Sequence, residues 1–213
     1  MATKRAKTLT DREIERLLKL VENSPIVESD RLKILLSFYA GLRVSEIAKL
    51  KSEAMLTADG RVAPYINIFS NVGKNRKERS IPMHPRIKEA FKAFLKRHPD
   101  EEFVALPYRQ QHLTTNGLTV WFHSLYKRAG FTGCSSHSGR RTFITTLARS
   151  ANQFGSSLKD VQAIAGHSRL DTTEAYIEPS DNIVGLVHSL GQASSRKGVR
   201  SVIRDTGPQR RFG

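Results

Sequence analysis

The stretch AIAGHSRLDTTEAYIEPS, residues 163–180, contains two side chains that could take part in a reaction, His167 and Tyr176. A histidine can move a proton near neutral pH, and a tyrosine hydroxyl can act as a nucleophile. An isolated phenol is a poor nucleophile, because its ordinary pKa is about 10. Tyr176 therefore needs cationic neighbours that favour its phenolate form, and other parts of the chain must supply them.

Three further stretches contain cationic side chains of the types that such a reaction needs. They are GLRVSEIAKL with Arg43, VGKNRKER with Lys74, and SSHSGRRTF with His137 and Arg140. His137 and Arg140 are three positions apart, so they share a face if their stretch is helical. Each stretch taken alone also fits an ordinary structural interpretation, such as a surface arginine or a solvated basic turn.

Taken together, the two arginines, two histidines, lysine and tyrosine fit the attack of a hydroxyl on a phosphodiester. Negative charge grows on the non-bridging oxygens when the phosphorus becomes five-coordinate. Guanidinium groups are permanently charged and can bind two oxygens at once, which suits Arg43 and Arg140 to this charge. Lys74 could protonate the departing oxygen, and the histidines could donate hydrogen bonds or move a proton. The mechanism requires no cofactor and no metal ion, and we expect neither.

Helical periodicity and turn signals predict an α+β fold, mainly helical with one small antiparallel sheet, that positions these side chains. The β-like runs YINIF and RSIPM predict the sheet, with its tip at Asn71–Lys77. The segment around Tyr176 is polar, and we expect it to be loop-like and movable. The predicted helices cover residues 8–22, 29–40, 41–50, 84–98, 113–131, 135–151, 157–167 and 181–190.

Two of these helices have candidate capping residues at their starts. Thr10 followed by Glu13 three residues later is a capping-box pattern for the helix over 8–22. Ser45 is the expected cap where the chain restarts after Gly41.

The composition restricts the class of protein and indicates a polyanionic partner. The 213 residues contain 35 Lys and Arg against 20 Asp and Glu, a net charge of +15 at pH 7. A basic surface of this size favours nucleic acid. No apolar run approaches the roughly 20 residues of a membrane-spanning helix, and the basic N-terminus lacks the apolar segment of a secretory signal. The single cysteine, Cys134, excludes a disulfide within the chain and fits a reducing intracellular setting.

The four reactive stretches resemble, in their order, the sequence boxes of the tyrosine recombinases, also called the phage integrase family. GLRVSEI, GKNRKERSIPM, HSGRRTF and AGHSRLDTTEAY resemble the boxes of the catalytic domain, and the resemblance extends from about Thr8 to about Leu190. It implies a site-specific DNA recombinase, an enzyme that cuts and rejoins DNA strands to integrate, excise or invert a segment. It also implies that neither ATP nor a metal is needed, because the covalent link to the enzyme conserves the bond energy.

The resemblance implies a role for each residue that matches a box. Arg43 and Arg140 resemble the paired phosphate-binding arginines, and His137 resembles the histidine that assists proton transfer. His167 resembles the second histidine, which hydrogen-bonds the scissile phosphate. Tyr176 resembles the nucleophile that forms a 3′-phosphotyrosyl link.

The basic turn and its surroundings leave alternatives open. Lys74 resembles the general acid for the 5′-hydroxyl leaving group, and Lys77 in the same turn is its rival. Glu46 matches an acidic position of the family, and we expect it to support the site rather than to react. Arg141 points to another helix face than Arg140, which suggests a contact with the DNA backbone or a structural role.

The expected organisation is a basic arm over 1–8, the catalytic domain over 9–190 and a basic, disordered tail over 191–213. Typical family members have a further helical domain ahead of the catalytic one, so the chain is either an excised catalytic domain or a naturally short member. Residues 181–190 have an apolar face that either exchanges between protomers or packs on its own domain. The expected partners are double-stranded DNA, other protomers in a tetrameric synapse and accessory DNA-bending proteins, in the cytoplasm near the nucleoid.

Two other functions remain open from the sequence. A type IB topoisomerase uses similar groups, and it would relax supercoiled DNA without site preference. A DNA-binding protein that kept the fold but lost catalysis would have a regulatory or accessory role. The presence of all six catalytic-type residues disfavours this second alternative.

Overall fold

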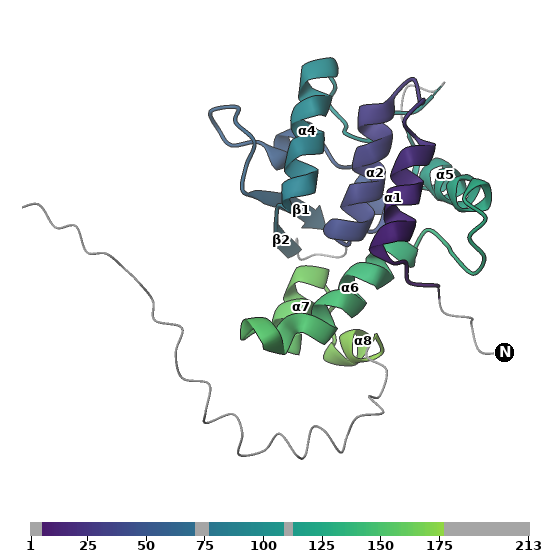
Figure 1. Ribbon diagram of the computed structural model, residues 1–213. Coiled ribbons are helices and arrows are strands. Elements are labelled where there is room, and N and C mark those ends of the chain that lie inside the picture. Colours follow the sequence, from purple (N-terminus) through teal and green to yellow (C-terminus); the bar gives the residue numbers. More distant parts are fainter. Residues whose placement is uncertain (1–5, 71–76, 109–112, 177–213) are drawn as a thin grey trace, which may run out of the picture. The chain divides into compact units, whose positions relative to one another are not determined.

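The computed structural model describes residues 6–70, 77–108 and 113–176, which belong to one compact unit (Figure 1). The described elements are helices and one antiparallel pair of strands, so the predicted α+β class, mainly helical with one small sheet, is confirmed. In chain order the elements are α1 (Asp11–Leu20), α2 (Val27–Tyr39), α3 (Val44–Ala48), η1 (Ser52–Met55), β1 (Tyr65–Ser70), β2 (Lys77–Pro82), α4 (Pro85–Arg97), α5 (Thr115–Arg128), α6 (Ser138–Ser150), η2 (Ala151–Phe154), α7 (Leu158–Ala165) and α8 (Leu170–Glu174).

Helix α2 is the centre of the core, because it contacts α1, α3, α4 and α6 (Figure 1). Its sequence is mostly apolar on every side, and its leucine, isoleucine and phenylalanine side chains are buried. Two charged residues of this helix are buried, Asp30 and Lys33, and they form an ion pair with 2.8 Å between Oδ1 and Nζ. Lys33 Nζ also donates to the carbonyl of Leu106 at 2.6 Å. The helix can therefore bury charge, since each charged group has a partner.

Helix α6 packs closely against α2, and a glycine makes this approach possible. A Cβ atom on Gly139 would lie 2.0 Å from Oγ of Ser37 in α2 and 3.0 Å from its carbonyl carbon. A larger residue would force the two helices apart. The glycine in HSGRRTF therefore brings the start of α6, with Arg140 as its next residue, against the core.

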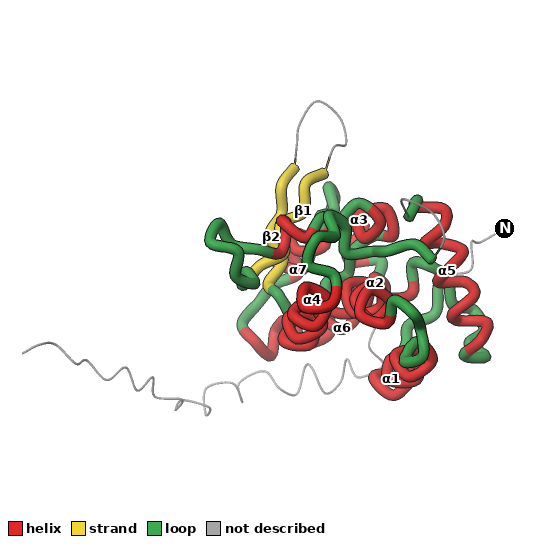
Figure 2. The backbone as a smooth tube through the Cα atoms, turned by 90° about the horizontal axis from the view of Figure 1, so that it is seen from above, coloured by secondary structure: helices red, strands yellow, loops and turns green. Residues whose placement is uncertain are grey.

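The two strands form a hairpin whose inner face joins the core (Figure 2). Ile66 pairs with Ile81 and Ile68 pairs with Arg79, and the three isoleucines are buried. Because side chains alternate along a strand, Arg79 lies on the same inward face as Ile81. Strand β2 also contacts α7, so this inward face meets the C-terminal part of the described chain.

Most predicted elements are present, with differences at their ends. The Thr10–Glu13 capping box is present at α1, with Thr10 Oγ1 accepting from the Glu13 amide. The prediction of Ser45 as a cap is wrong, because Arg43 is the N-cap residue of α3 and the Glu46 carboxylate accepts from its backbone amide. The strand predicted as RSIPM begins two residues earlier, at Lys77, and ends at Pro82.

The region before Tyr176 is more ordered than its polar sequence suggests. Residues Leu170–Glu174 form the short helix α8, where we expected a loop. Thr173, whose side chain is fully buried, anchors this turn of helix. The predicted tip of the hairpin and the predicted helix over 181–190 lie outside the described residues, apart from Lys77 at the start of β2.

Candidate active site

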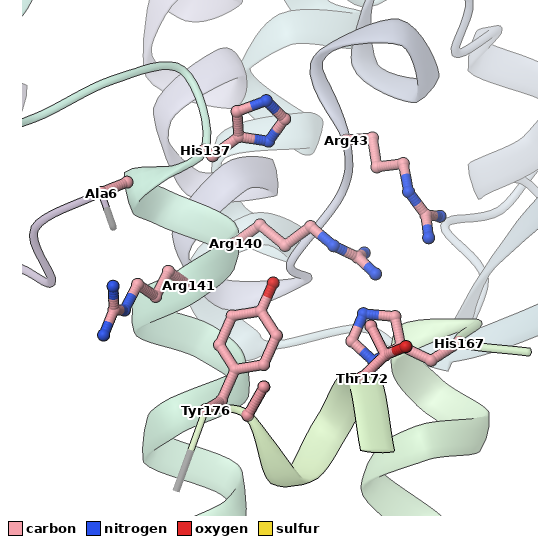
Figure 3. Close-up of a pocket in the computed structure, with 9 residues that line it drawn as sticks. Ala6, Arg43, His137, Arg140, Arg141, His167, Thr172 and Tyr176 are labelled. Atoms are coloured by element: carbon pink, nitrogen blue, oxygen red, sulfur yellow. The ribbon is translucent and has the colours of Figure 1, made fainter. Parts of the chain in front are cut away.

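One pocket of about 480 Å³ brings five of the six predicted site residues together (Figure 3). They come from three separate parts of the chain: the start of α3, the start of α6, and the segment from the end of α7 to the turn after α8. The residues that line the pocket are Ala6, Arg43, His137, Arg140, Arg141, His167, Thr172, Ala175 and Tyr176.

Arg140 is the buried cation of the pocket. It lies in the first turn of α6, and only 5% of the residue is exposed. Its Nη1 donates to the carbonyl of Gly41 at 2.7 Å and its Nη2 to the carbonyl of Ala165 at 2.6 Å. Burial, assisted by the positive charge of Arg43, lowers the pKa of the guanidinium to about 10. Arg140 therefore stays charged at neutral pH, and its remaining N–H groups can serve a ligand.

Arg43 is the more exposed of the two predicted phosphate-binding arginines. Its side chain is 39% exposed, and its Nη1 donates to Oε1 of Glu46 at 3.0 Å. Burial raises the pKa of the Glu46 carboxyl, but hydrogen bonds and charges from Arg79 and Arg43 outweigh burial, so the pKa lies below its ordinary value. Glu46 is thus a buried carboxylate that supports Arg43, as the family resemblance implied.

The C-terminal end of α7 holds three guanidinium groups through consecutive carbonyls. The carbonyl of Ile164 accepts from Arg79 Nε at 3.1 Å, and that of Ala165 accepts from Arg140 Nη2 at 2.6 Å. The carbonyl of Gly166 accepts a longer bond, 3.4 Å, from Arg43 Nη2. Carbonyls at a helix C-terminus lack partners within the helix and carry partial negative charge. This turn therefore partly offsets the repulsion among the three arginines.

His167 directly follows the residue that ends α7. Gly166 has φ +66°, a left-handed conformation that ends the helix, and the His167 amide donates back to the carbonyl of Gln162. The Nδ1 atom of His167 lies 2.9 Å from Oγ1 of the buried Thr173. Burial, and then the charges of the three neighbouring arginines, lower the pKa of His167 to about 4. The imidazole is therefore neutral at pH 7.

Tyr176 lies in the turn after α8, and its hydroxyl points into the pocket toward Arg140 (Figure 3). Its ring stacks on the ring of His167, with 5.8 Å between centroids and 22° between planes. The Tyr176 amide donates to the carbonyl of Thr173 at 3.0 Å, which continues the helical turn. The same buried threonine therefore orients both His167 and the backbone that leads to Tyr176.

His137 and Arg141 complete the pocket in different ways. His137 is the exposed N-cap residue of α6, and its ring lies at the pocket edge opposite His167 (Figure 3). The Arg141 guanidinium points away from the centre formed by Arg43, Arg140 and Tyr176 (Figure 3). This direction fits the expectation that Arg141 belongs to another face of the helix than Arg140.

The structure describes only part of the basic turn and of the strand that follows it. Lys74 lies outside the described residues, as does the side chain of its rival Lys77. Arg79, which the sequence placed where the basic turn meets the predicted strand RSIPM and to which it gave no role in the site, is paired with Glu46 and with the end of α7. The period-two pattern with Ile81 is the signal that could have placed Arg79 on the inner face of the hairpin.

The described ranges also contain no group of three or more His, Cys, Asp or Glu side chains placed to bind one metal ion. Among the same residues, no helix has both the length and the apolar character needed to cross a membrane.

Comparison with known proteins relates this geometry to a family. The model of the phage integrase family matches residues 7–182. The tyrosine recombinase XerA of Thermococcus kodakarensis is 32% identical over 177 residues, which are 80% of this chain and 57% of that relative. The chain thus spans little more than half the length of this curated relative.

Solved structures of similar proteins share the fold. A crystal structure of XerA recombinase superposes on this chain with a TM-score of 0.66 at 22% identity. The superposed region is 86% of this chain and 64% of the XerA chain. The Tn1549 transposon integrase, in complex with transposon right end DNA, gives a TM-score of 0.66 at 20% identity, over 90% of this chain and 68% of its own. The family model matches most of the length of this chain, and the fold is that of the solved XerA structure. The chain therefore belongs to the phage integrase family of tyrosine recombinases.

Proposed function

We propose that the chain is the catalytic domain of a site-specific DNA recombinase that cleaves and rejoins strands through a 3′-phosphotyrosyl intermediate. One observation carries this proposal: the Tyr176 hydroxyl shares a pocket with two arginines and two histidines, all from sequence boxes of the family. A phosphodiester is the substrate that such a cationic pocket with one phenol fits best. The Tn1549 relative in complex with DNA supports the same substrate class.

In the proposed cleavage step, the Tyr176 oxygen forms a bond to phosphorus while the bond from phosphorus to the 5′ oxygen breaks. Arg43 and Arg140 neutralise the charge that grows on the non-bridging oxygens. Arg140 is preorganised for this role, because two backbone carbonyls already fix its guanidinium. The phenolic proton of Tyr176 passes to solvent or to His137 at the pocket edge.

The neutral state of His167 suits it to donate a hydrogen bond rather than a proton. When Nδ1 accepts from the Thr173 hydroxyl, the proton of the imidazole resides on Nε2. Nε2–H can then donate to a non-bridging oxygen of the phosphate. Lys74 is the proposed general acid that protonates the departing 5′ oxygen, with Lys77 as its alternative. Rejoining reverses the step: a 5′ hydroxyl attacks the phosphotyrosine and releases the phenol.

The remaining expectations are proposals of the same kind. The catalytic domain extends over 9–190, between a basic arm and a basic tail, and it acts on double-stranded DNA. Other protomers join it on the DNA as a tetrameric synapse, with accessory DNA-bending proteins, in the cytoplasm near the nucleoid. The net charge of +15 supports the DNA partner, because phosphate neutralisation drives such binding.

A trapping experiment tests the proposed function. The chain is incubated at low salt with a library of end-labelled duplexes that have a randomised central sequence and a nick, so that cleavage releases a short fragment and traps the enzyme. We expect a labelled protein–DNA adduct on a denaturing gel, lost in Tyr176→Phe, and sequencing of the adducts recovers the preferred site. An adduct that persists in Tyr176→Phe overturns the assignment of the nucleophile, and a wild-type chain without any adduct overturns the proposed function.

A further inference from the structure

Arg79 does not line the pocket, yet its guanidinium bonds to two of the elements that build it. Nη1 and Nη2 each donate to one oxygen of the Glu46 carboxylate, both at 2.9 Å. Nε donates to the carbonyl of Ile164 at 3.1 Å. Both side chains of the ion pair are nearly buried, with 11% of Arg79 and 13% of Glu46 exposed. Strand β2 is thereby tied to α3 through Glu46 and to the end of α7.

We propose that Arg79 is a positioning residue that fixes the Glu46 carboxylate and so keeps the guanidinium of Arg43 directed at the scissile phosphate. This inference rests on the proposed strand-transfer function. Arg79 itself is not among the residues that line the pocket, and its guanidinium is already bonded to Glu46 and to the carbonyl of Ile164.

Four N–H donors share the carboxylate of Glu46. Its two carboxylate oxygens accept from Arg79 twice, from the Arg43 amide and from Arg43 Nη1. Arg43 thus gives only one N–H of its guanidinium to the carboxylate, together with the long bond to Gly166. The other N–H groups of Arg43 remain for a phosphate that enters the pocket.

Removing the Arg79 guanidinium changes this balance. A buried carboxylate that loses two charge-assisted hydrogen bonds must find new partners, and Arg43 is the remaining cation beside it. A fork-to-fork pair between Glu46 and Arg43 would then withdraw the N–H groups that serve the phosphate. The long, partly exposed side chain of Arg43 is free to make this move.

The same side chain supports the segment that ends in His167. A Cβ atom on Gly166 would lie 3.0 to 3.2 Å from Cδ, Nη1 and Nε of Arg79, so the guanidinium lies directly against this glycine. Arg79 therefore fixes the carbonyl turn that also accepts from Arg140 and Arg43. These contacts hold the Arg79 guanidinium in the place from which it binds Glu46, the residue through which the proposed effect on Arg43 passes.

The test compares two forms of one suicide duplex, built on the site recovered from the library. The first has an ordinary scissile phosphate. The second has a methylphosphonate, which lacks the charge on one non-bridging oxygen and therefore needs less help from a guanidinium. The variants are Arg79→Gln, Arg79→Lys and Arg43→Gln. Arg86→Gln is the control, because Arg86 forms an ion pair with Glu15 outside the pocket.

We expect Arg79→Gln to slow adduct formation on the phosphate duplex roughly 10- to 100-fold, as for loss of a group that orients a binding residue. On the methylphosphonate duplex we expect the same variant to be within a few-fold of wild type, as we expect for Arg43→Gln. Arg79→Lys should be intermediate, since an ammonium cannot reproduce the planar fork. Arg86→Gln should match wild type on both duplexes.

Two results would overturn the proposal while the proposed function stands. In the first, wild type forms the Tyr176-dependent adduct and Arg79→Gln forms it equally fast. In the second, Arg79→Gln is slowed equally on both duplexes, as expected of a poorly folded enzyme or of one with an impaired leaving-group step. The ratio between duplexes is measured within one preparation, so the folded fraction does not affect it.

A double-mutant cycle with Glu46→Gln tests the proposed route of the effect. If Arg79 acts through Glu46, the variant with both changes should be no slower on the phosphate duplex than the slower single variant. Additive losses from the two changes would show that Arg79 acts by another route, and they would overturn the proposal.

Discussion

At the scale of single residues, the surroundings of Arg140 and His167 determine how these two side chains act in the pocket. Arg43, His137, Arg140, His167 and Tyr176 line one pocket, and their identities alone suggested phosphoryl chemistry. The pKa values of Arg140 and His167 depend on burial and on neighbours from other elements, which no local pattern encodes. Arg79 pairs with Glu46, which lies 33 residues away in the chain. A run of basic residues in a sequence does not predict a pairing with so distant a carboxylate.

The neutral state of His167 predicts a dependence of stability on pH. The pKa of its imidazole falls from 6.5 to about 4 in the folded chain. As the pH decreases from 6.5 toward 4, the unfolded chain binds a proton that the folded chain does not, so stability decreases over this window. Between pH 7.5 and 5, the free energy of unfolding of wild type should decrease by roughly 1 to 2 kcal/mol more than that of His167→Asn.

Urea unfolding at pH 7.5, 6 and 5, at constant ionic strength, measures this difference. Comparing the two proteins cancels the contributions of the other titratable groups. Parallel decreases in wild type and His167→Asn would show that His167 is protonated in the folded chain as readily as in the unfolded one.

At the scale of elements, apolar periodicity predicted the long helices well, because burial determines both the pattern and the structure. Helix α8 was missed because Leu170–Glu174 has no apolar stripe, and it is instead held by the buried Thr173. Tyr176 packs on a small hydrophobic cluster that is separate from the main core. The buried residues of this cluster are Ile144, Ala151, Val161 and Ala165. The contact between α6 and the main core is therefore important for the position of the site.

That contact depends on Gly139, and a larger side chain at this position should weaken it. We expect Gly139→Ala to lower the free energy of unfolding by about 1 to 3 kcal/mol, as overpacking does, although alanine favours a helix by about 1 kcal/mol over glycine. The cause is the 2.0 Å approach of the new Cβ to Oγ of Ser37. Urea unfolding measures the change.

Gly117→Ala in α5 is the matched control. Its Cβ would meet only side-chain atoms of Leu113 and Thr114, each at 3.3 Å. We expect this change to shift stability by less than about 1 kcal/mol in either direction. Equal effects of the two substitutions would contradict the view that close packing of α2 and α6 requires a glycine.

At the scale of the whole molecule, the proposed binding to DNA is supported by the net charge, but assembly depends on surfaces that a single sequence does not reveal. The described residues form one unit and provide a pocket with five site residues, whereas Lys74 and residues 181–190 lie outside them. The spacing of the apolar residues predicts an amphipathic helix over 181–190, with a face of Ile183, Val184, Leu186, Val187 and Leu190. The pattern does not determine whether its apolar face packs on its own domain or on a neighbouring protomer.

Two truncations separate the role of this segment from that of charge. One chain ends at residue 190 and the other at residue 180, so both lose the tail over 191–213, which has six basic residues and one acidic residue. The shorter chain also lacks residues 181–190, in which Asp181 is the one residue that carries a formal charge. Both should therefore bind a single site more weakly and with a smaller salt dependence than the full chain. If 181–190 joins protomers, only the shorter chain should fail to assemble on a duplex with two sites, as measured by sedimentation of labelled DNA. Equal assembly by both truncated chains would contradict the exchange between protomers and favour packing of the segment on its own domain.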